Sequence, residues 1–185
     1  MLNVKTIDFF TSNKGKVAEA RLFLRPLGYK VTWRKADLLE PQQSGLEEVV
    51  KVKLGSAPIG ADLTMVEDSG FFVHSLNGFP GVYSSYVFKV LGVGGVLRLL
   101  DGLPRDAHFE AVVGIRRGGV VNLFKGVLNG KVSTRQKGRH GFGFDPIFVP
   151  EGLTLTMAEL TRQDKVMISH RSRALAALAG WLRVQ

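Results

Sequence analysis

The chain has 185 residues, of which 25 are Lys or Arg and 16 are Asp or Glu, so its formal net charge is +9 at neutral pH. It contains no cysteine, which excludes disulfides and thiolate metal sites and is typical of a protein in the reducing cytoplasm. The first ten residues carry Lys5 and Asp8 within an apolar run, so we expect no signal peptide, and no later stretch reaches the roughly 18 apolar residues of a membrane span.

A strand, a turn and a helix are predicted at the start of the chain. Thr6–Phe10 has the composition of a strand, and Val31–Trp33 is a second, shorter candidate. The helix between them is indicated by apolar residues at three- and four-residue steps, namely Val17, Ala20, Leu24 and Leu27. Gly28 is a plausible helix stop.

A capping box predicts the start of the next helix, with Ser44 as N-cap and Glu47 three residues later. One face of this helix carries Leu46, Val49, Val50 and Leu54. Leu63–Val66 then has the composition of a buried strand that ends at the acidic pair Glu67-Asp68.

The second half of the chain predicts helix, hairpin and helix. Ser84–Leu100 is helical in pattern but weakened by three glycines, and His108–Arg116 alternates and returns after Gly118-Gly119 as a hairpin strand over Val120–Val127. A last helix begins near His170. Early alternation of strands and helices followed by a hairpin predicts an α/β fold with a mixed sheet, in one domain over residues 1–185.

The turn after the first strand has the residues of a phosphate-binding loop. A helix N-terminus offers backbone N–H groups and a partial positive charge, and here a glycine and two lysines join it. The loop consists of Thr11, Ser12, Asn13, Lys14, Gly15 and Lys16. It lacks the spacing of a Walker A motif, and an ordinary strand-to-helix turn is the alternative.

Three carboxylates are candidate ligands for a hard cation. Glu40 precedes a proline, and Glu67 and Asp68 follow the buried strand. Exposed loop acids are the alternative, but if the fold brings the three together, Mg²⁺ is the expected ion where phosphates complete the coordination.

Two later segments are candidates for binding a flat ring. Residues 140–148 alternate Gly with Phe142 and Phe144 and then reach Asp145. The two aromatic rings either stack on a ligand or join the core. The last helix starts with basic residues that oppose its dipole, so a bound anion or polar ring explains them, as does a solvated helix start. His74 and His108 are interpreted as single histidines without partners.

Six features follow one another along the chain: TSNKGK, Glu40, EDSGF, LNGFPGVYSSY, GFGFDPIF and SHRSRAL. As an ordered set, they resemble the inosine/xanthosine triphosphate pyrophosphatase family from Thr11 to Leu178. The resemblance implies an elongated mixed sheet with flanking helices, two lobes around a central substrate cleft, and a homodimer. It also implies Mg²⁺-dependent hydrolysis of ITP, dITP and XTP to the monophosphate and pyrophosphate, which clears damaged nucleotides.

The resemblance also implies roles for individual residues. Asp68 would be the proton acceptor and a metal ligand with Glu40, while the contribution of Glu67 to the metal site is left open. The implied substrate-binding residues are Thr11 to Lys16, Lys53, Ser69, Phe142, Gly143, Phe144, Asp145, Lys165, His170 and Arg171. The family tyrosine is replaced by Phe144, and the usual Asp-Asp pair is Glu-Asp here.

Base selection and two rival functions stay open at this point. A donor such as Arg171 or His170 would favour a 6-oxo purine over adenine, because adenine would leave the donor unpaired. A nucleic-acid-binding module would explain the basic run over residues 135–140 but not the three acids. A pyrophosphatase for modified pyrimidine nucleotides is the second rival.

Overall fold

The computed structural model describes residues 5–43, 45–59 and 62–185. Its seven strands form one sheet in the order β2-β1-β3-β5-β6-β7, with β4 paired to β3. β1 is parallel to β2 and β3, whereas β3 with β4 and β6 with β7 are antiparallel. The predicted α/β class with a mixed sheet is therefore confirmed.

The strands are β1 (Thr6–Phe10), β2 (Lys30–Arg34), β3 (Leu63–Val73), β4 (Pro80–Gly81), β5 (Asp106–Arg117), β6 (Val120–Val132) and β7 (Phe148–Pro150). The helices are α1 (Lys14–Leu24), α2 (Leu46–Ser56), α3 (Ser84–Val90), α4 (Gly92–Leu99), α5 (Arg162–Ile168) and α6 (His170–Arg183). Short 3₁₀ turns are η1 (Arg25–Leu27), η2 (His74–Leu76) and η3 (Asp145–Ile147).

The chain divides into two compact units, each described by itself here. The first consists of Met1–Asp68, Ala111–Gly126 and Arg171–Gln185, and the second of Ser69–Glu110 and Val127–His170. None of the helices in the described residues combines the length and apolar character that crossing a membrane requires.

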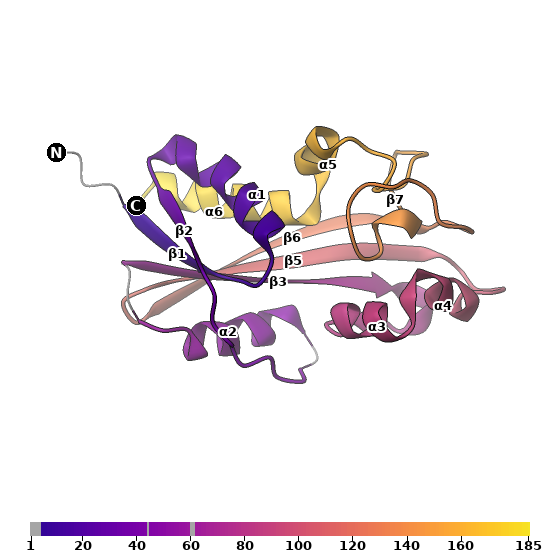
Figure 1. Ribbon diagram of the computed structural model, residues 1–185, viewed down its shortest axis with the longest axis horizontal. Coiled ribbons are helices and arrows are strands. Elements are labelled where there is room, and N and C mark those ends of the chain that lie inside the picture. Colours follow the sequence, from indigo (N-terminus) through magenta and orange to yellow (C-terminus); the bar gives the residue numbers. More distant parts are fainter. Residues whose placement is uncertain (1–4, 44, 60–61) are drawn as a thin grey trace. The chain divides into compact units, whose positions relative to one another are not determined.

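In the first unit, helices cover both faces of the sheet. α1 and α6 lie on one side and α2 on the other (Figure 1). Side chains of β1, β3 and β5 on the first face form a buried core with α1 and α6, including Phe9, Met65, Val113, Leu24 and Leu178. Because successive strand residues face opposite ways, the next residues of the same strands face α2.

α1 ends earlier than its sequence predicts. Asn13 is its N-cap and accepts hydrogen bonds from the backbone N–H groups of Gly15 and Lys16. The α-helix ends at Leu24 and gives way to η1 at Arg25, and Gly28 then closes the segment with φ +80°, a conformation that glycine adopts without strain.

Two expected boundaries differ from the structure. The N-cap of α2 is Gly45 rather than the predicted Ser44, which lies outside the described residues. β3 was expected to end at Val66, but it continues through Glu67-Asp68 to Val73. Pairing with β4, which sets Phe71 opposite Gly81, supports the added length of the strand.

The second half of the chain follows the predicted order with finer divisions. The helical stretch breaks into α3 and α4 at Gly92, whose φ is +66°. β5 and β6 form the predicted hairpin but extend further than expected. The sequence did not predict α5, because seven residues are too few to establish a helical period.

Aromatic packing organises the core of the second unit. The Phe71 ring lies 5.0 Å from the rings of Phe109 and Phe144 and 5.9 Å from that of Phe148, measured between centroids. These rings pack with Val96 of α4 and with Leu100, which directly follows that helix, in one buried cluster.

Substituting Gly114→Ala should destabilise the protein, because a Cβ there would lie 2.5 Å from Val50 and 2.7 Å from Leu54 of α2. Overpacking of this kind costs about 1–3 kcal/mol in the free energy of unfolding, which urea denaturation measures. Gly55→Ala, within α2 and with open space around it, is the control and should stabilise by about 0.5–1 kcal/mol. Equal effects of the two variants would contradict this packing of α2 on β5.

Candidate functional site

β3 directs the two adjacent carboxylates to opposite faces of the sheet. Glu67 follows Leu63 and Met65 on the face that packs with α1 and α6, whereas Asp68 shares the α2 side. Each carboxylate therefore meets its own cations. The expected repulsion between neighbouring like charges is relieved by this separation.

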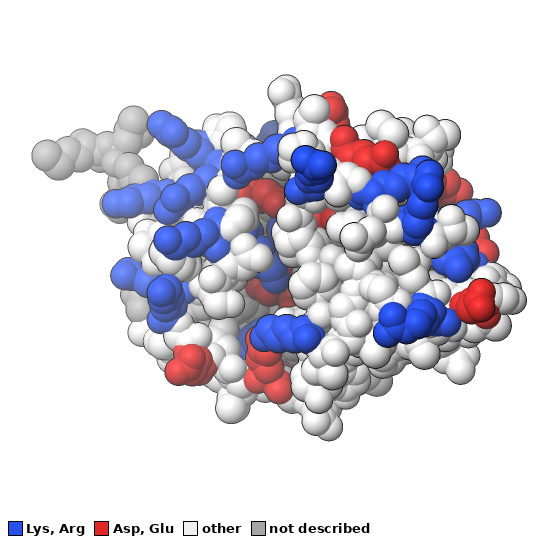
Figure 2. Space-filling model, turned by 45° about the vertical axis from the view of Figure 1, so that its right-hand side comes forward, with Lys and Arg blue, Asp and Glu red and all other residues white. Residues whose placement is uncertain are grey.

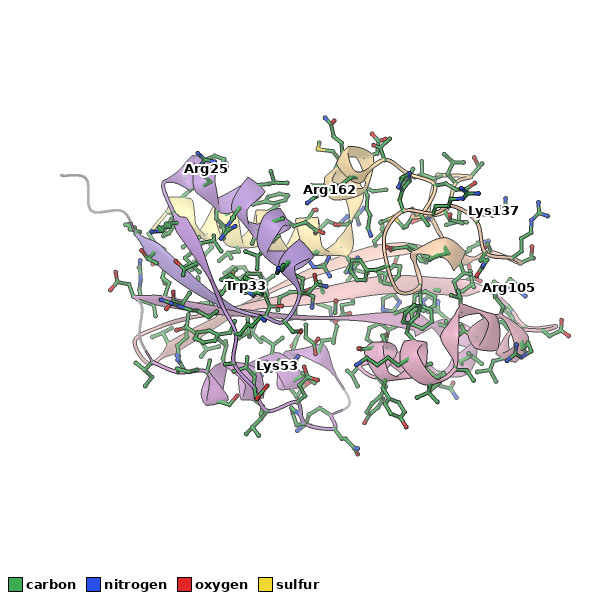
Figure 3. The ribbon with its side chains drawn as sticks, viewed as in Figure 1. Arg25, Trp33, Lys53, Arg105, Lys137 and Arg162 are labelled. Carbon is green, nitrogen blue, oxygen red and sulfur yellow. The ribbon has the colours of Figure 1, made fainter. Side chains whose placement is uncertain are left out.

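Asp68 and Glu40 converge on Lys53 of α2, which is labelled in Figure 3. The Lys53 ammonium lies 2.9 Å from Oε1 of Glu40 and 3.4 Å from Oδ2 of Asp68. Lys53 is buried, while the side chain of Glu40 is 75% exposed and that of Asp68 20% exposed. The fold thus brings Glu40, Lys53 and Asp68 together, without Glu67.

The pKa of Lys53 is raised above its ordinary value of 10.5. Burial alone would lower this pKa, but the negative charges of Asp68 and Glu40 outweigh burial. Lys53 is therefore charged at neutral pH. Since its folded-state pKa exceeds the unfolded one, its stabilising effect is present below pH 10.5 and is lost as the pH rises through the folded-state pKa.

Glu67 belongs to a second cluster, which we call the buried quartet: Lys16, Glu19, Glu67 and Arg171. Oε2 of Glu67 lies 2.5 Å from the Lys16 ammonium, and Oε1 accepts a hydrogen bond of 3.1 Å from Nε of Arg171. Nη1 of Arg171 donates to both oxygens of Glu19 at 3.3 and 3.4 Å.

Arg171 is 2% exposed, so it is a buried cation held by two carboxylates. Burial would lower the pKa of its guanidinium, but the charges of Glu67 and Glu19 outweigh burial and raise it. The sequence left a bound anion, a polar ring and a solvated helix start open as explanations for the basic residues at the start of α6. Arg171 instead pairs with anions of the protein, and its role in reading a base stays a prediction.

The loop before α1 is ordered by its own side chains. Thr11 accepts a hydrogen bond of 3.1 Å from the backbone N–H of Asn13, whose Oδ1 accepts bonds of 2.8 and 3.4 Å from Gly15 and Lys16. Ser12 and Lys14 are exposed. Two N–H groups of the first turn are therefore already capped by Asn13.

Trp33 of β2, also labelled in Figure 3, supports this loop. Its indole N–H donates to the backbone oxygen of Thr11 at 2.8 Å, and the Lys14 ammonium lies 5.2 Å from its ring centroid. Such cation–π contacts are worth about 0.5–1 kcal/mol at exposed sites. Sequence reasoning treated Trp33 only as a strand residue.

In the second unit, Asp145 is buried and is bonded both within its own loop and to Lys165 of α5. Its Oδ2 accepts hydrogen bonds from the Phe142 backbone N–H at 2.7 Å and from the Lys165 ammonium at 2.5 Å. The same ammonium lies 4.8 Å from the centroid of the Phe142 ring, which is 52% exposed. Gly143, at φ +60°, continues the turn.

Phe144 and His170 are buried among aromatic rings. Phe144 is 3% exposed and stacks on Phe71, while His170 is 5% exposed and stacks on Phe109 at 4.9 Å. The ring of Phe144 is therefore a core residue, which explains how a phenylalanine is tolerated where the family has tyrosine. Ser69, which follows Asp68 in β3, is half-buried.

The interpretation of His74 and His108 as single histidines is wrong. Nε2 of His74 lies 3.0 Å from Nδ1 of His108, and the His108 ring stacks on Phe72 with centroids 4.9 Å apart. β3 and β5 bring together residues 34 positions apart in the chain. No local spacing in the sequence signals such a pair.

The donor set fits a magnesium ion bound with help from its substrate. Across the described residues, no three His, Asp or Glu side chains gather where they can hold a metal. Glu40 and Asp68 are two carboxylates converging on one point, and Mg²⁺ is commonly bound by one or two carboxylates plus substrate phosphates. Both oxygens of Glu67 are occupied by protein cations.

The fold and the site together define a class of protein. It is an α/β protein with a mixed sheet, a cluster of acids around a lysine, and a helix N-terminus that carries lysines. The chain belongs to the Ham1 family, whose model matches residues 7–181. This confirms the resemblance to inosine/xanthosine triphosphate pyrophosphatases that the sequence blocks indicated.

Relatives cover nearly the whole chain. It is 44% identical to a dITP/XTP pyrophosphatase of Pyrococcus horikoshii, over 96% of this chain and 97% of that protein. It is 46% identical to the dITP/XTP pyrophosphatase of Thermococcus kodakarensis, over 96% and 97%. The structure of a HAM1 protein from Coxiella burnetii matches with a TM-score of 0.87 at 29% identity, over 98% of this chain and all of that one.

Arg171→Ala should destabilise the protein by about 3–5 kcal/mol, because it leaves the carboxylates of Glu19 and Glu67 buried without their cation. Arg173→Ala, two residues along α6 and exposed, is the matched control and should change the free energy of unfolding by less than about 1 kcal/mol. Urea denaturation measures both. A loss below about 1 kcal/mol for Arg171→Ala would contradict the buried pairing.

Proposed function

We propose that this protein is a Mg²⁺-dependent nucleoside triphosphate pyrophosphatase that hydrolyses ITP, dITP and XTP to the monophosphate and pyrophosphate. The observation that carries the proposal is the convergence of Glu40 and Asp68 on Lys53 in a chain 44–46% identical to dITP/XTP pyrophosphatases. The proposed role is removal of damaged purine nucleotides.

Mg²⁺ is proposed to be held by Glu40 and Asp68, with substrate phosphates as further ligands. When bound, the ion neutralises charge on the triphosphate and on the leaving pyrophosphate. The sequence left Glu67 open as a third ligand. Its engagement by Lys16 and Arg171 favours a set of two carboxylates without it.

Asp68 is proposed to orient and deprotonate the attacking water. The water oxygen bonds to the α-phosphorus, the bond from that phosphorus to the bridging oxygen breaks, and pyrophosphate leaves. A triphosphate carries about four negative charges near neutral pH, so the attack requires cations. Lys53, Lys14 and Lys16 supply positive charge without covalent chemistry.

The remaining predicted residues are proposed to bind the nucleotide. Thr11 to Lys16 would contact phosphates, and Ser69 would contact the substrate. The base and sugar would be bound by Phe142, Gly143, Phe144, Asp145, Lys165, His170 and Arg171. Because the Phe144 ring is buried, its contribution would come from its backbone.

Three broader proposals go with this activity. We propose a homodimer, a cytoplasmic location and a substrate cleft between two lobes, each resting on the family resemblance or on the cysteine-free composition.

Lys and Arg side chains are scattered over the face seen in Figure 2 and are interspersed with Asp and Glu. On this face the basic side chains do not form the continuous surface that binds a long nucleic acid.

Pyrophosphate release should occur with ITP, dITP and XTP in the presence of Mg²⁺ and be abolished by EDTA. ATP should react more slowly by roughly 5- to 150-fold, because an unpaired donor in the base site costs about 1–3 kcal/mol. GTP and dTTP complete the panel. Preference for dTTP would favour the pyrimidine rival, and salt-sensitive duplex binding without pyrophosphate release would favour a nucleic-acid-binding module.

Asp68→Asn should lower kcat by roughly 10²- to 10⁴-fold while ITP still binds, because the amide cannot accept the proton from water. Asp106→Asn is the control, since the side chain of Asp106 is 56% exposed and pairs only loosely with Lys131 at 3.8 Å. Steady-state pyrophosphate release measures both. Turnover of Asp68→Asn close to that of the unmodified protein would refute the assignment.

A further inference from the structure

The buried quartet contains two residues that have no direct role in the proposed reaction, Glu67 and Glu19. Glu19 lies in α1, one helical turn beyond Lys16, and residues three apart share a helix face. Its carboxylate contacts Arg171 and is partly buried, with 13% of the side chain exposed. The quartet holds two cations and two anions, so its charges balance.

The contacts assign a separate partner to each oxygen of Glu67. Oε1 accepts from Nε of Arg171, and Oε2 faces the Lys16 ammonium. Arg171 in turn uses Nη1 for Glu19. The contacts run from Glu19 to Arg171, then to Glu67 and finally to Lys16. They start in the second turn of α1, pass through α6 and β3, and return to the first turn of α1.

We propose that Glu19 is a positioning residue for the phosphate-binding end of α1. This rests on the proposed function, in which that end contacts the substrate phosphates. Glu19 holds Nη1 of Arg171, while Nε of the same guanidinium donates to Oε1 of Glu67. Oε2 of Glu67 therefore remains available to fix Lys16.

Removing the Glu19 charge changes the partner of Arg171. A guanidinium forms a fork that matches a carboxylate with two parallel hydrogen bonds, and a buried arginine needs such partners. Without Glu19, Arg171 turns this fork onto both oxygens of Glu67. Lys16 then loses the oxygen that orients it, although Lys16 itself is unaltered.

Positioning and simple charge predict opposite results. Deleting a carboxylate makes the surroundings of Lys16 more positive, so Coulomb attraction alone would tighten the binding of an anion. Loss of positioning weakens that binding, because a mobile lysine must be ordered again when the anion arrives. The sign of the affinity change therefore separates the two explanations.

The test is calorimetric titration of Glu19→Gln with inorganic pyrophosphate in the presence of Mg²⁺, together with ITP kinetics. We expect Kd for pyrophosphate and KM for ITP to rise by roughly 5- to 30-fold. This rise is smaller than the largest one expected from losing a hydrogen bond to a charged group, because Lys16 itself is retained. The value of kcat should fall by a smaller factor than KM rises, since the proposed base Asp68 lies on the opposite face of β3. Unchanged or tighter pyrophosphate binding would overturn the proposal.

Two controls separate positioning from general damage. Glu47→Gln removes a 46% exposed carboxylate from α2 and should leave Kd for pyrophosphate unchanged. In a Lys16→Met background, Glu19→Gln should have no further effect on Kd, because the residue it positions is gone. An equal effect in that background would overturn the proposal.

The remaining outcomes are also decisive. If Glu19→Gln does not unfold cooperatively, Glu19→Asp replaces it: the carboxylate is retained but set back by about 1.5 Å, so Kd should rise in the same direction by less. Pyrophosphate affinity of that variant at or above the original would overturn the proposal. If the unmodified protein releases no pyrophosphate from ITP, the proposed function fails, whereas the pyrophosphate titration still tests Glu19.

Discussion

The alternation of side chains along β3 is the constraint on which the candidate site depends. Because the strand does not end at Val66, Glu67 and Asp68 are held in extended backbone and point to opposite faces. Two charges adjacent in sequence become parts of two separate ion clusters. A turn at this position would have allowed both carboxylates to face one side and to share one cation.

The two clusters differ in exposure and therefore in what they can do. Arg171 and Glu67 are almost fully buried, and such a network costs desolvation and contributes a fixed geometry. Glu40 is mostly exposed and Asp68 partly so, which leaves these two carboxylates accessible to solvent. The buried cluster is suited to hold α1 in place, and the accessible one is suited to chemistry.

Much of the fold was predictable because hydrophobic period is a local property. β1, α1, the face of α2, the hairpin and α6 were all indicated by spacing of two or of three to four residues. The length of β3 and the short α5 were not. β3 is stabilised beyond Val66 by pairing with β4, and β4 and α5 are both too short to show a period.

The sequence by itself determined the family, the mixed α/β class and the identity of the chemical groups, because ordered motifs and periodicity are written along one chain. Only the tertiary structure decided their partners. Arg171 pairs with Glu19 across 152 positions and with Glu67 across 104, and Phe144 stacks on Phe71 in the core. Ion pairs and ring contacts act over a few ångströms of space, so which residues share them depends on packing and not on separation along the chain.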